Sequence, residues 1–202
     1  MSKFIDVFSQ YIGDLKLSKT LLNAEVDGIK IDTKKRTMDM NLFLSQLVKR
    51  NEIFSTEKQI EQSTLALAKC IIHPHFDSSL FGDACYFGLV EEIRRRLASI
   101  NGTLNGSTVS ISDDKMTINL THGGADILLE KKVDKEFQKL INEEFGVNVK
   151  VKFDGITHID ADSEIYIEHQ RIAEETAKRE AVINEMEIYE GVMHEAKKRS
   201  EH

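Results

Sequence analysis

The chain has 202 residues, of which 41% are hydrophobic and 30% are charged, and its formal net charge is −7. This length allows one ordinary domain or two small ones, and no apolar run approaches the roughly 18 residues that a membrane span requires. The negative charge argues against a protein that holds a phosphate backbone by electrostatics alone, because such proteins are basic.

The acidic excess is concentrated at the C-terminal end. Residues 156–202 contain 12 acidic and 6 basic side chains, whereas residues 1–155 contain 22 and 21. The larger part is therefore nearly neutral, and the sequence predicts that it forms the folded body, followed by an acidic connector.

Cysteine usage and the first residues favour a cytoplasmic protein. Cys70 and Cys85 are the two cysteines, and no CxxC pattern is present. This favours buried, reduced thiols over a disulfide framework or a zinc site. Residues 1–6 alternate polar and apolar types and lack the apolar stretch of a signal peptide.

The first block, residues 1–77, begins with a helix and a hairpin. Apolar residues recur at helical spacing over residues 4–15. Residues 25–32 and 36–44 read as two strands, because apolar and polar side chains alternate in the second of them. Residues 32–35 supply a polar turn between the strands.

A second helix and a closing strand complete this block. Thr56 can cap a helix that continues to about Cys70. Residues 71–77 then form a plausible strand. The block therefore has the order αββαβ.

The second block, residues 78–155, repeats this order. Residues 86–100 carry an apolar stripe at helical spacing, which Asn101-Gly102 ends. Residues 107–112 and 115–121 form a short hairpin. A helical stretch over 125–145 then stops at Gly146, and residues 147–153 alternate as a strand does.

We therefore predict an α+β fold of two small αββαβ modules, the first module at 1–77 and the second module at 78–155. Each should contain a sheet of about three strands backed by helices. A charged C-terminal helix over 163–198, with few core contacts, should follow within the acidic connector at 156–202.

Three local patterns imitate chemical sites without completing them. His73-Pro-His75 offers two metal ligands but no third nearby. Residues 160–171 open like a calcium loop but lack its glycine and its final glutamate. His122-Gly123-Gly124 lies outside any phosphate-binding glycine pattern and reads as a tight turn. We predict no catalytic residue, no metal ligand and no cofactor.

Two basic clusters could contact nucleic acid or an acidic partner. They are Arg94, Arg95 and Arg96 on the helix at 86–100, and Lys131 and Lys132 within the stretch at 125–145. The alternative for both is an ordinary solvated helix face.

Several strings of this chain resemble the N-terminal region of PolC-type DNA polymerase III, the replicative polymerase alpha subunit of Gram-positive bacteria. The hairpin Ala-Glu-Val-Asp-Gly-Ile-Lys-Ile-Asp-Thr-Lys-Lys-Arg-Thr-Met-Asp-Met-Asn-Leu at 24–42 resembles the first small domain of that family. The run of strand, helix and strand over 115–154 resembles its second small domain. The charged segment that follows resembles the family's connector to an OB-fold.

The resemblance implies a partner and a second fold. The family's first domain contacts the tau subunit of the clamp loader, which makes Lys34, Lys35 and Arg36 in the predicted turn a candidate partner-binding surface. The second domain resembles a type II KH fold. Nucleic-acid-binding KH domains carry a GxxG loop between two helices, whereas residues 131–134 here contain no glycine.

The resemblance also implies that the family's catalytic domains lie elsewhere. The chain resembles part of a DNA-directed DNA polymerase, yet these residues hold no active site. We expect a non-catalytic accessory region that docks the polymerase to the replisome during DNA replication. At most weak contact with single-stranded DNA is expected, with no membrane and no small-molecule substrate. The alternative is a stand-alone KH-like nucleic-acid-binding protein.

Overall fold

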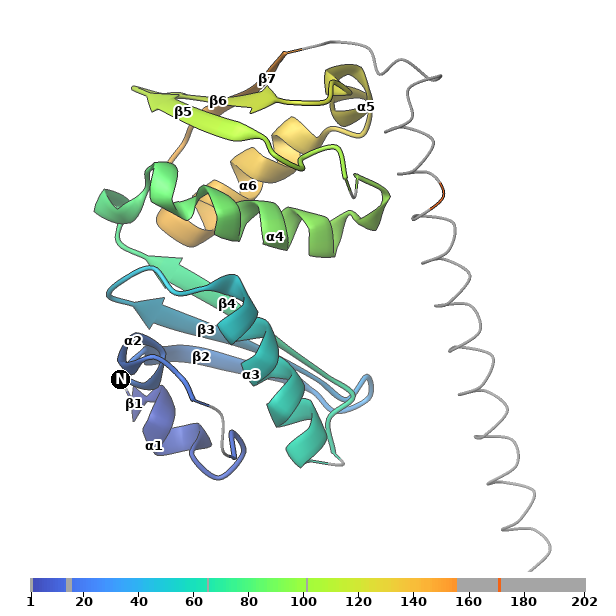
Figure 1. The fold of residues 1–202 in the computed structure, drawn as a ribbon. Coiled ribbons are helices and arrows are strands. Elements are labelled where there is room, and N and C mark those ends of the chain that lie inside the picture. Colours follow the sequence, from blue (N-terminus) through green and yellow to red (C-terminus); the bar gives the residue numbers. More distant parts are fainter. Residues whose placement is uncertain (1, 14–15, 65, 101, 156–170, 172–202) are drawn as a thin grey trace, which may run out of the picture. The chain divides into compact units, whose positions relative to one another are not determined.

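The computed structural model of this chain describes residues 2–13, 16–64, 66–100, 102–155 and 171. Contacts divide the chain into two compact units, Met1–Ile156 and Thr157–His202. The helix expected over 163–198 lies outside the described residues, apart from Arg171. All the elements below belong to the first unit (Figure 1).

The first module contains a mixed four-stranded sheet in the order β1-β2-β3-β4. The pairs β1–β2 and β2–β3 are antiparallel, and β3–β4 is parallel. Its elements are β1 (Ser2–Lys3), α1 (Phe4–Phe8), α2 (Lys19–Leu22), β2 (Glu25–Asp32), β3 (Thr37–Leu44), α3 (Arg50–Ser63) and β4 (Lys69–Phe76).

Strict alternation in β3 and β4 builds the core of this module. Met38, Met40, Leu42 and Leu44 of β3 are all buried, and the residues between them face the other side of the sheet. β4 buries Cys70, Ile72, Pro74 and Phe76 in the same way. Pro74 lacks an N–H donor, and it stands on the strand at the end of the sheet order, where a proline is tolerated.

The second module contains a separate three-stranded sheet in the order β5-β6-β7. The β5–β6 pair is antiparallel, and β6–β7 is parallel. Its elements are η1 (Ser78–Leu80), η2 (Asp83–Cys85), α4 (Tyr86–Arg96), η3 (Ala98–Ile100), β5 (Thr108–Ser112), β6 (Lys115–Leu120), α5 (Ala125–Glu130), α6 (Val133–Phe145) and β7 (Lys150–Gly155).

The helices of this module cover one face of its sheet. Met116, Ile118 and Leu120 of β6 are buried, as are Phe137 and Leu140 of α6. Figure 1 shows α4 and α6 lying between the two sheets. The α+β class and the repeated element order are confirmed. The boundary predicted between 77 and 78 stays a prediction, since both sheets lie in one compact unit.

Two predicted helices differ from the observed ones. α3 runs over Arg50–Ser63, so Thr56 lies inside it instead of capping it, and its hydroxyl donates to the Glu52 carbonyl at 2.7 Å. The first helix is also shorter than predicted, since α1 ends at Phe8.

The stretch over 125–145 is two helices, α5 and α6, separated at Lys132. This residue has φ 55°, a left-handed conformation that a helix cannot continue through. Gly146 ends α6 as predicted, with φ 66°. The following strand begins at Lys150, three residues later than predicted.

Candidate partner surfaces and the network between the modules

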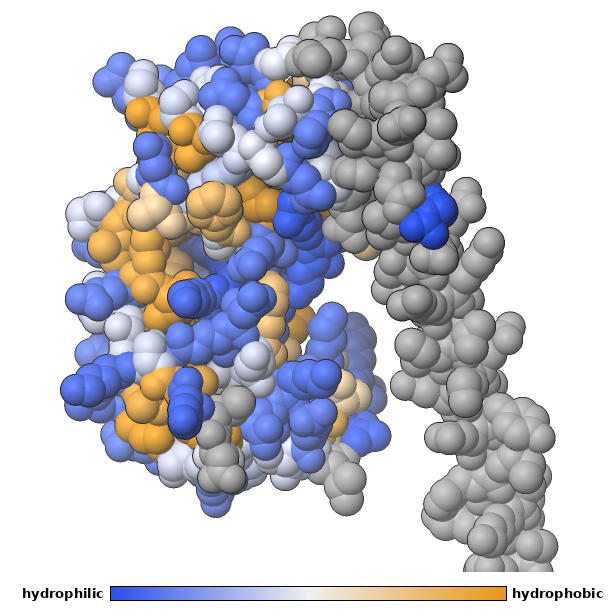
Figure 2. Space-filling view, in the orientation of Figure 1, coloured by the Kyte–Doolittle hydropathy of each residue, from blue (hydrophilic) through white to orange (hydrophobic). Residues whose placement is uncertain are grey.

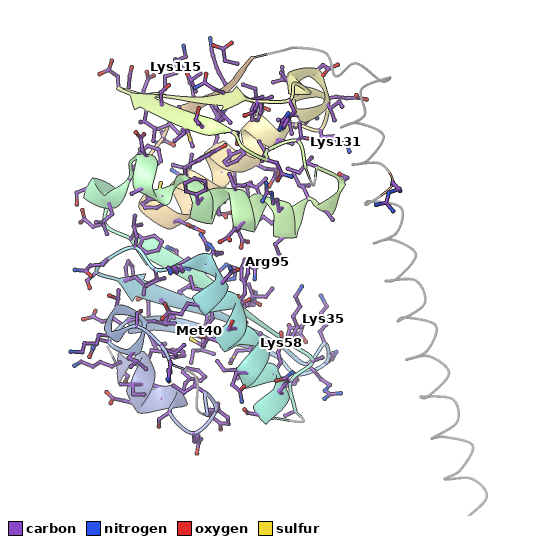
Figure 3. The ribbon with its side chains drawn as sticks, in the orientation of Figure 1. Lys35, Met40, Lys58, Arg95, Lys115 and Lys131 are labelled. Carbon is purple, nitrogen blue, oxygen red and sulfur yellow. The ribbon has the colours of Figure 1, made fainter. Side chains whose placement is uncertain are left out.

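The predicted partner-binding residues lie between β2 and β3, at the tip of the hairpin, where Figure 3 labels Lys35. The Asp32 carboxylate accepts the backbone N–H groups of Lys34 and Lys35, both at 3.0 Å, which fixes the turn. Arg36 has φ 57°, and its Nε donates to the Ala66 carbonyl at 3.2 Å. The side chains of Lys34 and Lys35 are exposed and form no ion pair with a described residue.

The arginine cluster at the end of α4 meets acidic side chains of both modules. Arg95 Nη1 lies 2.6 Å from Glu57 of α3, and Nη2 lies 2.9 Å from Glu92 of its own helix. The Arg95 guanidinium also lies 4.4 Å from the centroid of the Phe54 ring, a cation–π arrangement. Arg95 therefore joins α4 to α3.

Arg96 and Arg94 are engaged as well. Arg96 pairs with Glu92 at 3.0 Å and with Glu143 of α6 at 3.2 Å. Arg94 donates to the Asn105 side chain at 2.6 Å. Because three carboxylates balance much of this cluster's charge, its attraction for a phosphate backbone is reduced. Nucleic-acid contact by these arginines stays a prediction.

A buried ion pair completes the junction. Arg50, the first residue of α3, donates from Nη2 to both carboxylate oxygens of Glu144 on α6, at 2.8 and 2.7 Å. Both side chains are only 5% exposed. Arg50 Nε also donates to the Gly88 carbonyl of α4 at 3.3 Å. One guanidinium therefore ties together three helices from the two modules.

Burial raises the pKa of two carboxylates in this junction. Burial raises the pKa of Glu144 above its ordinary value, and the neighbouring Arg50 opposes that shift. Burial also raises the pKa of Glu57, opposed by the bond from the Ile72 N–H and by Arg95. These perturbations arise in a structural network, since no nucleophile lies among the hydrogen-bond partners of these groups.

Sequence reasoning missed Arg50, Glu57, Glu92 and Glu144. Each is a charged residue within an amphipathic helix, where such residues normally face solvent. The Arg50–Glu144 and Glu57–Arg95 contacts join positions 94 and 38 residues apart, so no local spacing could have indicated them. The pairs of Glu92 with Arg95 and Arg96 do have the i,i+3 and i,i+4 spacing that a helix brings together.

A polar cavity of about 420 Å³ opens beside this junction. His73 and His75 of β4 contribute to its lining, but each is already bonded. His73 Nε2 lies 3.0 Å from the Asp39 carboxylate, and His75 Nδ1 donates to the Glu143 carbonyl at 2.9 Å. The described residues contain no group of three or more metal-ligating side chains. The two histidines that the sequence offered as metal ligands are therefore each bonded to an oxygen of the same chain.

A shallower groove of about 620 Å³ lies at the other end of the junction. Phe43, Phe76 and Phe145 line it together with polar residues such as Glu25 and Asp77. Figure 2 shows hydrophobic residues gathered at this place, near the C-terminal ends of β3 and β4. The Phe76 and Phe145 rings stack with centroids 5.1 Å apart, whereas Phe43 is 44% exposed.

The second basic cluster lies at the α5–α6 turn. Lys131 and Lys132 are both exposed, and Lys131 Nζ donates to the Ser99 carbonyl at 3.1 Å (Figure 3). Among the described residues, no hydrogen bond or ion pair links this cluster to the arginines of α4. Its predicted nucleic-acid contact stays a prediction.

Both cysteines are buried, free thiols, as predicted. Burial raises the pKa of Cys70 to about 12 and also raises the pKa of Cys85. Both thiols are therefore protonated near neutral pH and are poor nucleophiles. Within the described part of the chain, no helix is long and apolar enough to cross a membrane.

Comparison with known proteins gives one family. The model of the family described as DNA polymerase III polC-type N-terminus II matches residues 88–199, which is more than half of the chain. The match begins within α4 and includes the whole sheet of the second module. No curated protein and no solved structure matches the chain.

Proposed function

This chain belongs to the family of polC-type DNA polymerase III N-terminus II, and from this premise we propose that it is a non-catalytic accessory region that docks a replicative polymerase to the clamp loader. The partner is the tau subunit, and the contact lies on the first module. The chain acts in the cytoplasm, where DNA replication takes place in bacteria.

The observation that supports this proposal most directly is the exposed positive charge of Lys34 and Lys35 at the hairpin tip. The Arg95 and Arg96 guanidinium groups pair with carboxylates of the same chain. The Lys34 and Lys35 side chains are exposed, and their ammonium groups form no ion pair with a described residue. Exposed charges on a rigid turn steer and orient an oppositely charged protein at little cost to the fold.

The test is titration of the whole chain with purified tau subunit at several salt concentrations. We expect binding that weakens as salt increases, and no polymerase, nuclease or phosphatase turnover. Replacing Lys34, Lys35 and Arg36 together with alanine should weaken the complex at least about tenfold, a loss of about 1.4 kcal/mol.

Two further variants control for misfolding and for a nonspecific effect of charge. The double substitution K34A/K35A leaves Arg36 in place, since its left-handed backbone and its bond to Ala66 could matter for folding. The triple substitution K115A/K150A/K152A removes the same charge from the sheet of the second module and should leave binding unchanged. No binding of tau by the intact chain would refute the docking function.

The second candidate function is contact with single-stranded nucleic acid through Lys131 and Lys132. Both are exposed at the turn between α5 and α6 of the second module, the module that resembles a KH fold in sequence. A salt-dependent gel shift with single-stranded DNA that is lost in K131A/K132A would favour this function over docking.

A further inference from the structure

β2 leaves part of its outer edge without a partner strand. β1 pairs with β2 only at Glu25 and Val26, and the register shifts between Val26 and Gly28. No described backbone group bonds to the outer edge of Gly28–Asp32. In an antiparallel pair, alternate residues direct their N–H and C=O groups away from the neighbouring strand. This segment therefore presents unpaired backbone donors and acceptors.

The same segment exposes two large aliphatic side chains. Ile29 lies opposite Met40 and Ile31 lies opposite Met38, so both isoleucines belong to the apolar face of the sheet. Met40 and Met38 are buried, whereas Ile29 is 41% exposed and Ile31 is 60% exposed. The apolar face thus continues beyond the helices that cover its centre. A strand added at this edge would bury more of both isoleucines.

Basic side chains surround this edge, so a strand that pairs with it is expected to be acidic. Lys30, Lys34 and Lys35 are exposed along the free segment and its turn. Asp32 is engaged by two backbone N–H groups of the turn. Lysines on an edge discourage pairing with neutral or basic strands, and they favour a strand that carries acidic residues.

The other sheet offers a direct contrast. β5 is also a terminal strand, but the turn beside it carries Asp113 and Asp114. β4 lies at the opposite side of the first sheet and packs against α6, where His75 of β4 donates to the Glu143 carbonyl. Of the described strand edges, β2 alone combines a basic turn with two exposed isoleucines.

We propose that the Gly28–Asp32 edge of β2 receives an extended, acidic segment of a partner protein as an additional strand. Main-chain hydrogen bonds supply part of the affinity, Ile29 and Ile31 pack against alternate aliphatic side chains, and the lysines pair with the acidic residues between them. This inference rests on the proposed docking function and specifies how the first module binds.

The experiment measures amide hydrogen exchange of the full chain alone, with tau subunit, and with a short synthetic peptide that alternates valine with glutamate. Slower exchange within Gly28–Asp32 in either complex supports the proposal. The same peptide with lysine in place of glutamate should not protect the segment. The double variant I29T/I31T keeps β-branched side chains on the strand, so it should fold, and should weaken binding at least about tenfold. I111T, at a partly buried position on the β5 edge, is the control for a substitution on another strand.

The possible results distinguish strand addition at β2 from docking to tau. Binding of tau with protection confined to another surface, such as the groove lined by Phe43, refutes the added strand but not docking. Protection by the acidic peptide without any tau binding retains the added strand and refutes the partner. Binding of neither probe overturns both, and equal loss in I111T would show that the effect is not specific to β2.

Discussion

Arg50 and Glu144 show how much one pair of residues contributes when both charges are removed from water. Each side chain is 5% exposed, and the guanidinium Nη2 reaches both carboxylate oxygens. Removing one member leaves the other charge buried without its partner, which typically costs about 3–5 kcal/mol.

We therefore expect Arg50→Met to lower the free energy of unfolding by about 3–5 kcal/mol, measured by urea denaturation. The double variant R50M/E144L should recover most of this loss, because it removes both charges. Lys139→Met breaks a surface pair with Glu143 at 3.8 Å and should cost less than about 1 kcal/mol. A loss of that small size in R50M would contradict a stabilising role for the pair.

Glu57 gives a pH-dependent prediction. Burial raises its pKa above the ordinary value of 4.5 in the folded chain. Between that value and the higher folded pKa, the folded state retains a proton that the unfolded state has released, so its contribution to stability falls as pH rises.

Glu57→Gln removes this titration and keeps an oxygen that can accept the Ile72 N–H, now bonded at 2.7 Å. The stability of the unchanged chain relative to E57Q should therefore decrease as pH rises from about 4 to about 7. Urea denaturation at each pH measures the difference. A relative stability that increases over this range would mean that Arg95 outweighs burial and lowers the folded pKa.

At the scale of elements, two glycines with open surroundings should respond oppositely to alanine. A Cβ atom at Gly88 or at Gly146 would meet nothing within 4 Å. Gly88 lies within α4, where alanine loses less conformational freedom on folding, so G88A should stabilise by about 0.5–1 kcal/mol. Gly146 ends α6 with φ 66°, so G146A should destabilise by about 1 kcal/mol or more. Equal effects in urea denaturation would refute this reading of the α6 terminus.

The sequence predicted strands better than helix limits. β2 and β3 match the predicted hairpin to within a residue, because alternation in 38–44 has a period that only a strand satisfies. α3 begins six residues before Thr56, since the buried face of that helix starts with Arg50, which no hydropathy pattern counts as apolar. Only a long-range carboxylate makes that position suitable for the interior.

The surroundings of the candidate surface residues could be predicted to unequal extents, for the same reason. Lys34 and Lys35 could be placed in a turn from neighbouring residues alone, and the Asp32 carboxylate that holds the turn is local. The surroundings of Arg95 depend on Glu57, which is 38 residues away. The exposed edge at Ile31 could not be predicted either, because exposure depends on where β1 stops pairing.

At the scale of the whole first unit, the contacts between the modules are of the kind found within a core. The Arg50–Glu144 pair is buried, and the Phe145 ring of α6 stacks on Phe76 of β4 at 5.1 Å. Phe81 meets the same Phe145 ring edge-on at 5.6 Å from within the second module, so the ring that contacts Phe76 is also packed inside its own module. Buried ionic and aromatic contacts of this density couple the stability of the two sheets, because neither module can unfold without exposing groups of the other.

This coupling predicts that Met1–Ile156 unfolds as one cooperative unit although it contains two sheets. The slowest-exchanging amides of β3 and β6 should then report the same free energy of opening in native-state hydrogen exchange. The sharper measurement uses Met40→Ala, which removes a fully buried side chain from β3 of the first module. In a cooperative unit, this substitution should lower the opening free energy of β6 amides as much as that of β3 amides. If only β3 loses protection, the modules are independently stable, and the Arg50–Glu144 pair joins two domains that each fold without the other.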